Sequence, residues 1–178
     1  MPAFVALLRG VNVGGVKVEM ARLKALAGGI GWEGAKTYIA SGNMVFCAEG
    51  APGALAAALE REIEADVGRA IPVLVLTAQE MRQIADSCPF EVEKGNQAHC
   101  VFCWDAPRID EALLEALKAP SEALQVVGGH VWMHHPEGFG TSRLAEKLGQ
   151  VVTGTKVTAR NLNSVRKLAE MVDAAAGA

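Results

Sequence analysis

The sequence has few cysteines and no long hydrophobic run. Its four cysteines, Cys47, Cys88, Cys100 and Cys103, are irregularly spaced along 178 residues. No stretch approaches the roughly 18 apolar residues that a helix needs to cross a bilayer. The first residues lack the basic start and the small-residue cleavage site of a secretory signal. We therefore expect a cytoplasmic protein with reduced thiols and no membrane association.

The chain also lacks an excess of positive charge, since its formal net charge is −3. Proteins that wrap nucleic acid are usually basic, because phosphate contacts dominate their affinity. The charge therefore argues against a general nucleic-acid-binding protein and leaves only a local basic patch open. Hydrophobic residues make up 51% of the chain, which is too many for intrinsic disorder and indicates a globular protein.

Two spacings that suggest metal or redox sites do not bring their side chains together. Cys100 and Cys103 lie three residues apart in a predicted strand, which sends them to opposite faces of a sheet. His134 and His135 are neighbours in another strand and also point apart. No Ser, His and Asp order with a nucleophile elbow is present, although a catalytic histidine stays open. We expect no metal and no cofactor, and whether the protein is an enzyme is left open.

Short apolar runs and helical stripes occur in the same order twice, as strand-helix-strand-strand-helix-strand with a further helix. In the first half we expect strands at 4–8, 36–39, 44–47 and 71–76, and helices at 20–27, 52–67 and 77–88. In the second half we expect strands at 99–104, 124–127, 131–134 and 151–158, and helices that begin near Pro107, Ser142 and Asn161.

This order predicts the α+β class, with two ferredoxin-like β-α-β-β-α-β repeats, mainly antiparallel sheets and an extra helix after each repeat. We place the first repeat at residues 1–95 and the second at 96–178. The duplication is inferred from the order of elements, since the two halves show no visible sequence identity.

Three segments of the chain resemble one protein family. They are Arg9-Gly-Val-Asn-Val-Gly-Gly15, Thr37-Tyr-Ile-Ala-Ser-Gly-Asn-Met-Val-Phe46 and Thr158-Ala-Arg-Asn-Leu-Asn-Ser-Val-Arg-Lys-Leu168. Together they resemble the bacterial family called domain of unknown function 1697, over nearly the whole chain. The resemblance implies a duplicated ferredoxin-like fold and brings no activity, substrate or cofactor with it. At Leu162 and Ser164 this chain departs from the Trp and Thr that the family pattern carries.

The segment from Arg9 to Lys17 is the main candidate for a ligand site. An arginine at a strand end leads into a loop that contains Gly10, Gly14 and Gly15 and feeds a helix. Backbone amides without side-chain bulk can converge on an anion, and a helix N-terminus adds partial positive charge. The pattern is neither a dinucleotide fingerprint nor a P-loop. The alternative is a loop whose glycines serve only to adopt positive φ.

Sheet topology predicts a second group of residues beside this loop. In a ferredoxin-like sheet the third strand runs antiparallel beside the first, so its beginning lies next to the first strand's end. Ser41 and Asn43 would then lie near Arg9 and orient a shared ligand. The alternative is a hairpin turn in which Gly42 and Asn43 simply adopt positive φ.

In the second half, two loops share the other edge of the predicted sheet. The loop at 138–143 precedes a helix and would cradle an anion with Ser142 and Arg143. The segment 160–163 opens the last helix. Helix capping explains Ser142 and Asn161 equally well, whereas capping alone does not explain Arg160 or Asn163. Whether this edge meets the Arg9 edge depends on how the repeats dock.

These loops predict a protein, either a binding protein or an enzyme, that acts on a phosphate-bearing or other anionic small ligand. The alternatives are a nucleic-acid-binding module and a non-enzymatic interaction or structural protein that uses an exposed sheet edge. The sequence sets neither a reaction nor an oligomeric state. The expected ligand-binding residues are Arg9, Gly10, Asn12, Gly14, Gly15, Lys17, Ser41, Asn43, Ser142, Arg143, Arg160, Asn161 and Asn163.

Overall fold

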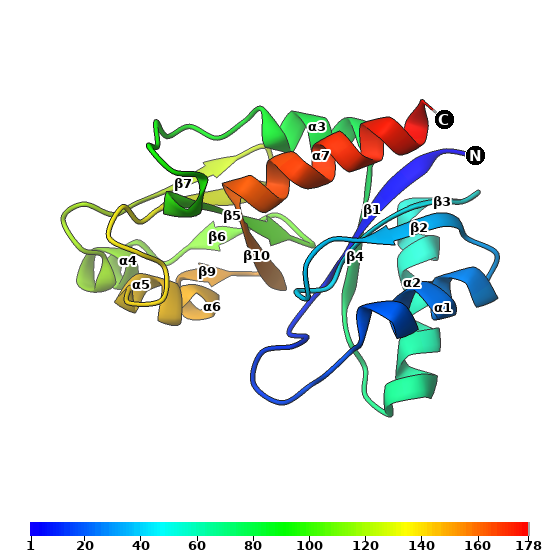
Figure 1. The fold of residues 1–178 in the computed structure, drawn as a ribbon. Helices are drawn as coiled ribbons and strands as arrows, with labels where there is room; N and C mark the ends of the chain where they lie inside the picture. Colours follow the sequence, from blue (N-terminus) through cyan, green and yellow to red (C-terminus); the bar gives the residue numbers. More distant parts are fainter. Residues whose placement is uncertain (178) are drawn as a thin grey trace. The chain divides into compact units, whose positions relative to one another are not determined.

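The computed structural model of the protein describes residues 1–177. It is a mixed α+β structure with two four-stranded sheets and one two-stranded ribbon (Figure 1). The chain divides into two compact units, Met1–Gln83 with Lys167–Ala178 and Ile84–Arg166. None of the helices that the described residues form is both long and apolar enough to cross a membrane.

The first unit is built around a sheet with the strand order β2-β3-β1-β4. Every neighbouring pair is antiparallel, and β1 lies between β3 and β4. The elements in chain order are β1 (Ala3–Leu8), α1 (Met20–Gly29), β2 (Glu33–Thr37), β3 (Asn43–Cys47), α2 (Pro52–Val67), β4 (Val73–Thr77) and α3 (Ala78–Ala85).

The core of the first unit follows from its apolar patterns. β1 is a continuous apolar run whose six residues are all buried, as expected of a strand covered on both faces. On one face, α2 packs Leu55, Leu59 and Ile63 into a single apolar cluster with residues of the sheet and of α1. This spacing of three to four residues is the buried stripe of an amphipathic helix. Gly68 ends the helix in the left-handed conformation at a φ of 77°.

The second unit holds a sheet with the order β10-β5-β8-β7, which is again antiparallel throughout. A separate ribbon pairs β6 with β9. The elements in chain order are the 3-10 turn η1 (Gly95–Gln97), β5 (Ala98–Cys103), β6 (Arg108–Ile109), α4 (Glu111–Leu117), β7 (Ala123–Val127), β8 (His130–His134), α5 (Arg143–Glu146), α6 (Leu148–Val151), β9 (Val152–Thr153), β10 (Val157–Asn161) and α7 (Leu162–Ala176).

The mixed α+β class and the antiparallel sheets confirm the prediction, whereas some boundaries were wrong. The first helix of the second half, α4, begins at Glu111 rather than near Pro107. Asp110 caps this helix by accepting a hydrogen bond from the Leu113 N–H at 3.0 Å. The residues after Pro107 form β6 of the two-stranded ribbon instead.

Two strands are displaced from their expected positions. β2 ends at Thr37 rather than at Ile39, because Ile39 has a φ of 49° and so leaves the extended conformation. The last strand of the second sheet is Val157–Asn161 rather than 151–158. Arg160 therefore lies within a strand, and not in a loop as the sequence suggested.

We expect Gly42→Ala to destabilise the protein more than Gly14→Ala. Both glycines have positive φ, 78° and 71°, so an L-residue costs about 1–2 kcal/mol at either position. A Cβ at Gly42 would lie 2.6 Å from Val11 Cγ2 and 2.8 Å from Leu8 Cβ, whereas a Cβ at Gly14 meets nothing within 4 Å. The clash should add about 1–3 kcal/mol. Urea unfolding followed by circular dichroism measures the difference, and equal losses would contradict this packing.

Candidate functional site

The loop after β1 and the loop between β2 and β3 lie together at one end of the first sheet (Figure 1). The pairing of β1 with β3 sets this arrangement, because it places the end of one strand beside the beginning of the other. The Leu8 N–H donates to the Gly42 carbonyl at 2.8 Å, and Gly42 packs against Leu8 and Val11. The sequence therefore placed these loops correctly. We call residues 9–17 and 38–42 the loop cluster.

Asn12 ties the two loops of the cluster together. Its side-chain Nδ2 donates to the Val18 carbonyl at 3.1 Å and to the Ala40 carbonyl. Its Oδ1 accepts from the Val18 N–H at 3.1 Å, and its own N–H donates to the Val16 carbonyl at 2.6 Å. Asn12 has a φ of 58°, a left-handed conformation that asparagine tolerates better than most residues. These bonds make Asn12 a residue that positions the loops.

Asn43 closes the second loop from the inside. It is fully buried, and its Nδ2 donates to the Tyr38 carbonyl at 3.1 Å and to Ser41 Oγ at 2.8 Å. The Tyr38 N–H donates in turn to the Asn43 carbonyl at 3.1 Å. The side chain of Asn43 is thus engaged by bonds within the turn, and Ser41 is one of the turn residues.

The glycine-rich loop presents backbone donors that the protein itself does not use. Within residues 1–177, the N–H groups of Gly14, Gly15 and Lys17 donate to no acceptor of the protein. Gly14 and Gly15 have φ values of 71° and 113°, which turn the backbone away from any regular structure. An open hollow of about 400 Å³ lies here, lined by Asn12, Gly14, Gly15, Val16, Lys17 and Ala40.

The positive charge at this loop comes from side chains and not from a helix end. α1 begins at Met20, and Glu19 precedes it as the N-cap residue. Between the glycines and the helix, Val18 is buried and bonded to Asn12, which keeps this stretch out of the helix. The helix that we expect after the loop is present from Met20 on, but residues 16–19 separate its first turn from Gly15. Arg9 and Lys17 are both exposed at the surface of the loop.

The candidate residues of the second half mostly serve the protein's own structure. Ser142 Oγ accepts from the Ala145 N–H at 3.0 Å, and Asn161 Oδ1 accepts from the Ser164 N–H at 2.9 Å. Both are helix caps, the alternative that the sequence left open. The amide of Asn163 occupies the space in which a Cβ at position 95 would stand.

Arg160 is buried, with only 7% of its surface exposed. Its Nη1 donates to Thr158 Oγ1 at 2.7 Å and to the Ala159 carbonyl at 2.9 Å. Burial lowers the pKa of Arg160 to about 10, because a buried charge loses its hydration. The guanidinium is thus engaged by oxygens of its own strand.

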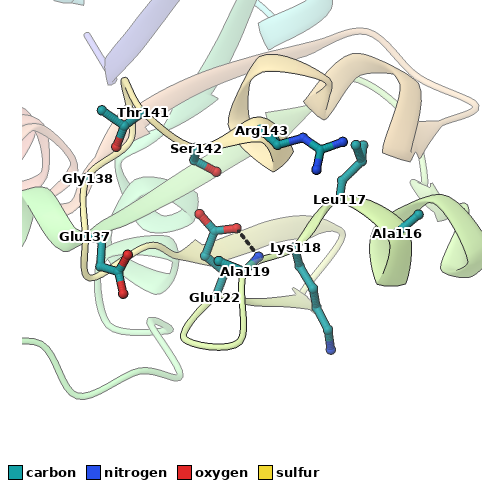
Figure 2. Close-up of a pocket in the computed structure, with 10 residues that line it drawn as sticks. All are labelled: Ala116, Leu117, Lys118, Ala119, Glu122, Glu137, Gly138, Thr141, Ser142 and Arg143. Carbon is teal, nitrogen blue, oxygen red and sulfur yellow. Dashed lines mark hydrogen bonds between the residues drawn. The ribbon is translucent and has the colours of Figure 1, made fainter.

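Arg143 lines a different hollow, of about 270 Å³, within the second unit (Figure 2). Two carboxylates, Glu122 and Glu137, and Lys118 line the same hollow. The Glu122 carboxylate accepts a hydrogen bond from the Ala119 N–H at 2.9 Å, which the dashed line in Figure 2 marks. The two acidic groups offset the two basic ones, so this hollow offers no net positive charge to an anion.

The loop cluster lies within the part of the chain that a known family model matches. The model of the family described as protein of unknown function DUF1697 matches residues 1–132. The chain belongs to this family. The whole of the first sheet and the loop cluster fall inside the match.

A solved structure shares the fold of this DUF1697 chain. It is that of a conserved bacterial protein from Streptococcus pneumoniae, with a TM-score of 0.75 and 22% sequence identity. The similarity covers 96% of this chain and 98% of the other. At this identity the comparison concerns the fold and carries no function with it. A comparison with curated proteins finds no match.

Sequence reasoning missed a pair of histidines in the second unit of the DUF1697 chain. His99 Nδ1 lies 2.6 Å from His135 Nε2, and the His99 ring stacks on Phe139 with 3.9 Å between ring centroids. His135 is fully buried, and its Nδ1 is the buried side-chain atom without a partner in the described residues. No sequence signal marks the pair, since it depends on the pairing of β5 with β8.

Burial dominates the electrostatics of the two histidines. It lowers the pKa of His99 to about 3, with smaller contributions from His135 and from the charge of Arg160. It also lowers the pKa of His135, while a backbone hydrogen bond and the charge of Glu122 raise this pKa and His134 acts in the same direction as burial. Both lowered pKa values favour neutral rings at neutral pH, so one imidazole donates its N–H to the ring nitrogen of the other.

We expect Asn12→Gly to loosen the loop cluster. Glycine adopts the same positive φ without strain, so the change removes only the side-chain hydrogen bonds. Three partly exposed bonds should be worth about 1–2 kcal/mol together. Hydrogen exchange measures the effect at Val18, whose N–H loses its acceptor and should exchange faster. The exposed Asn96→Gly is the control, and unchanged exchange at Val18 would contradict the role of Asn12.

We expect the protein to lose stability as the pH falls below about 6.5, the ordinary pKa of histidine. Between this pH and about 3, His99 binds a proton in the unfolded chain and not in the folded one, so acid favours unfolding. His99→Gln should reduce the pH dependence of the unfolding free energy in this window by about one proton. Urea unfolding at several pH values measures it. An unchanged slope would show that His99 is not held neutral.

Proposed function

We propose that the loop cluster binds an anionic, phosphate-bearing small ligand. The observation that carries the proposal is the set of N–H groups at Gly14, Gly15 and Lys17, for which the described residues provide no acceptor, beside an open hollow of about 400 Å³. Successive backbone N–H groups in a turn form concavities that bind anions. Lys17 adds a full positive charge in the wall of the same hollow.

The contacts narrow the set of proposed ligand-binding residues. A direct contact with the ligand fits Gly10, Gly14, Gly15 and Lys17. Arg9 and Ser41 belong to the same loop cluster. Asn12 and Asn43 fit the role of holding the loops in shape, because their side chains bond to backbone and turn atoms. In the second unit, the capping bonds of Ser142 and Asn161 and the burial of Arg160 favour structural roles.

The two alternative functions have less support. Binding through a free sheet edge is disfavoured at β2, because a register irregularity between Glu33 and Lys36 distorts this edge strand. Gly34, with a φ of 61°, lies within the irregularity. For nucleic-acid binding, the net charge of −3 supplies no broad basic surface.

We infer that the chain descends from one duplicated ferredoxin-like β-α-β-β-α-β element, with repeats at residues 1–95 and 96–178. The two sheets support this duplication, because in each the first strand lies between the third and the fourth: β2-β3-β1-β4 and β7-β8-β5-β10.

We also infer a cytoplasmic location, which agrees with the free thiols of all four cysteines.

Isothermal titration with inorganic phosphate and pyrophosphate tests the proposed function. We expect Lys17→Gln to weaken binding about 10- to 100-fold, since a hydrogen bond to a charged group is worth about 1.5–3 kcal/mol. Lys24→Gln, an exposed lysine on α1, is the matched control and should bind as the wild type does. The absence of binding to the wild type, or equal losses in both variants, would refute the proposal.

A further inference from the structure

Ile39 adopts a backbone conformation that its side chain disfavours. Its φ is 49°, and within residues 1–177 only Asn12 shares a positive φ among residues other than glycine. Asparagine tolerates this region, whereas a β-branched residue there is a genuine outlier. Burial does not compensate for the strain, because 53% of the Ile39 surface is exposed. Such strain is typical of positions that a ligand uses.

A second exposed apolar side chain lies in the same cluster. Val13, with 72% of its surface exposed, follows Asn12, and Ile39 precedes Ala40. The hydrogen bond from Asn12 Nδ2 to the Ala40 carbonyl therefore fixes the two apolar positions relative to each other. A single exposed apolar residue needs no explanation, whereas here two lie on loops that a hydrogen bond joins.

The hollow of the loop cluster is lined by chain neighbours of these two residues. Asn12 and Ala40, which neighbour the two apolar residues in the chain, both line it. Its walls are mostly apolar, with Lys17 as the one charged residue among those that line it. The cluster thus combines a small cationic end with an aliphatic surface.

The inference drawn from this combination rests on the proposed function and deepens it. We propose that the ligand is a phosphate monoester with an apolar organic group. Its phosphate meets Lys17 and the N–H groups of the glycine-rich loop. Its apolar group packs against Ile39 and Val13, which gives isoleucine a role at a position that glycine or asparagine would occupy with less strain.

Titration with three probes of graded polarity tests the proposal. Inorganic phosphate, glycerol 3-phosphate and phenyl phosphate present the same anionic group with no organic group, a polar one and an apolar one. We expect phenyl phosphate to bind the wild type at least about tenfold more tightly than glycerol 3-phosphate, since burial of apolar surface favours binding.

Variants at the two apolar positions assign the effect to the cluster. Ile39→Asn keeps a residue that tolerates positive φ, so the protein should resist urea as well as the wild type or better. It should abolish the advantage of phenyl phosphate and leave the affinity for inorganic phosphate unchanged, and Val13→Ser should reduce that advantage in the same way. Val126→Asn, at an exposed valine of the second unit, is the control that should change neither affinity.

The outcomes separate the two proposals. If no probe binds, the proposed function fails and this inference fails with it. If inorganic phosphate binds through Lys17 and phenyl phosphate binds no better than glycerol 3-phosphate, only this inference is overturned. It is also overturned if the advantage of phenyl phosphate survives in both Ile39→Asn and Val13→Ser.

Discussion

The side chain of Asn12 makes the hydrogen bonds on which the shape of the loop cluster depends. One amide bonds to backbone atoms of the loop that follows β1 and of the loop that joins β2 to β3. Because these bonds satisfy the asparagine internally, the glycines that follow need not pair with the protein. The loop keeps an irregular course in which the N–H groups of Gly14, Gly15 and Lys17 have no acceptor among residues 1–177.

Several short polar side chains in this protein form hydrogen bonds with nearby main-chain groups. Asn43, Ser142 and Asn161 each bond to a nearby main-chain group, which is the local competition that favours such residues in turns and at helix ends. A motif of Asn, Ser and Gly is therefore a weak guide to ligand contacts. What distinguishes the loop cluster is what its internal bonds leave over: backbone donors, a lysine and exposed apolar groups.

The fold and the family show what this chain is similar to, but they do not assign it a function. A sheet of this kind supports many unrelated functions, so an argument for function has to come from the site itself. In the loop cluster, the backbone strain and exposure of Ile39 matter as much as the charge of Lys17. Ile39 is strained and exposed at once, a combination that folding alone does not favour.

The sequence by itself determined the α+β class, because hydrophobic period and glycine turns are local signals. The meeting of the two loops followed from the strand order that we expected for this sequence of elements, in which the third strand lies beside the first. The end of α2 at Gly68 was also predictable, because a helix-ending glycine is a local signal. Only the tertiary structure decided which candidates stay at the surface. Arg160 was buried and Asn43 enclosed, and His99 was joined to His135, because strand register and burial depend on contacts between segments that are distant in the sequence.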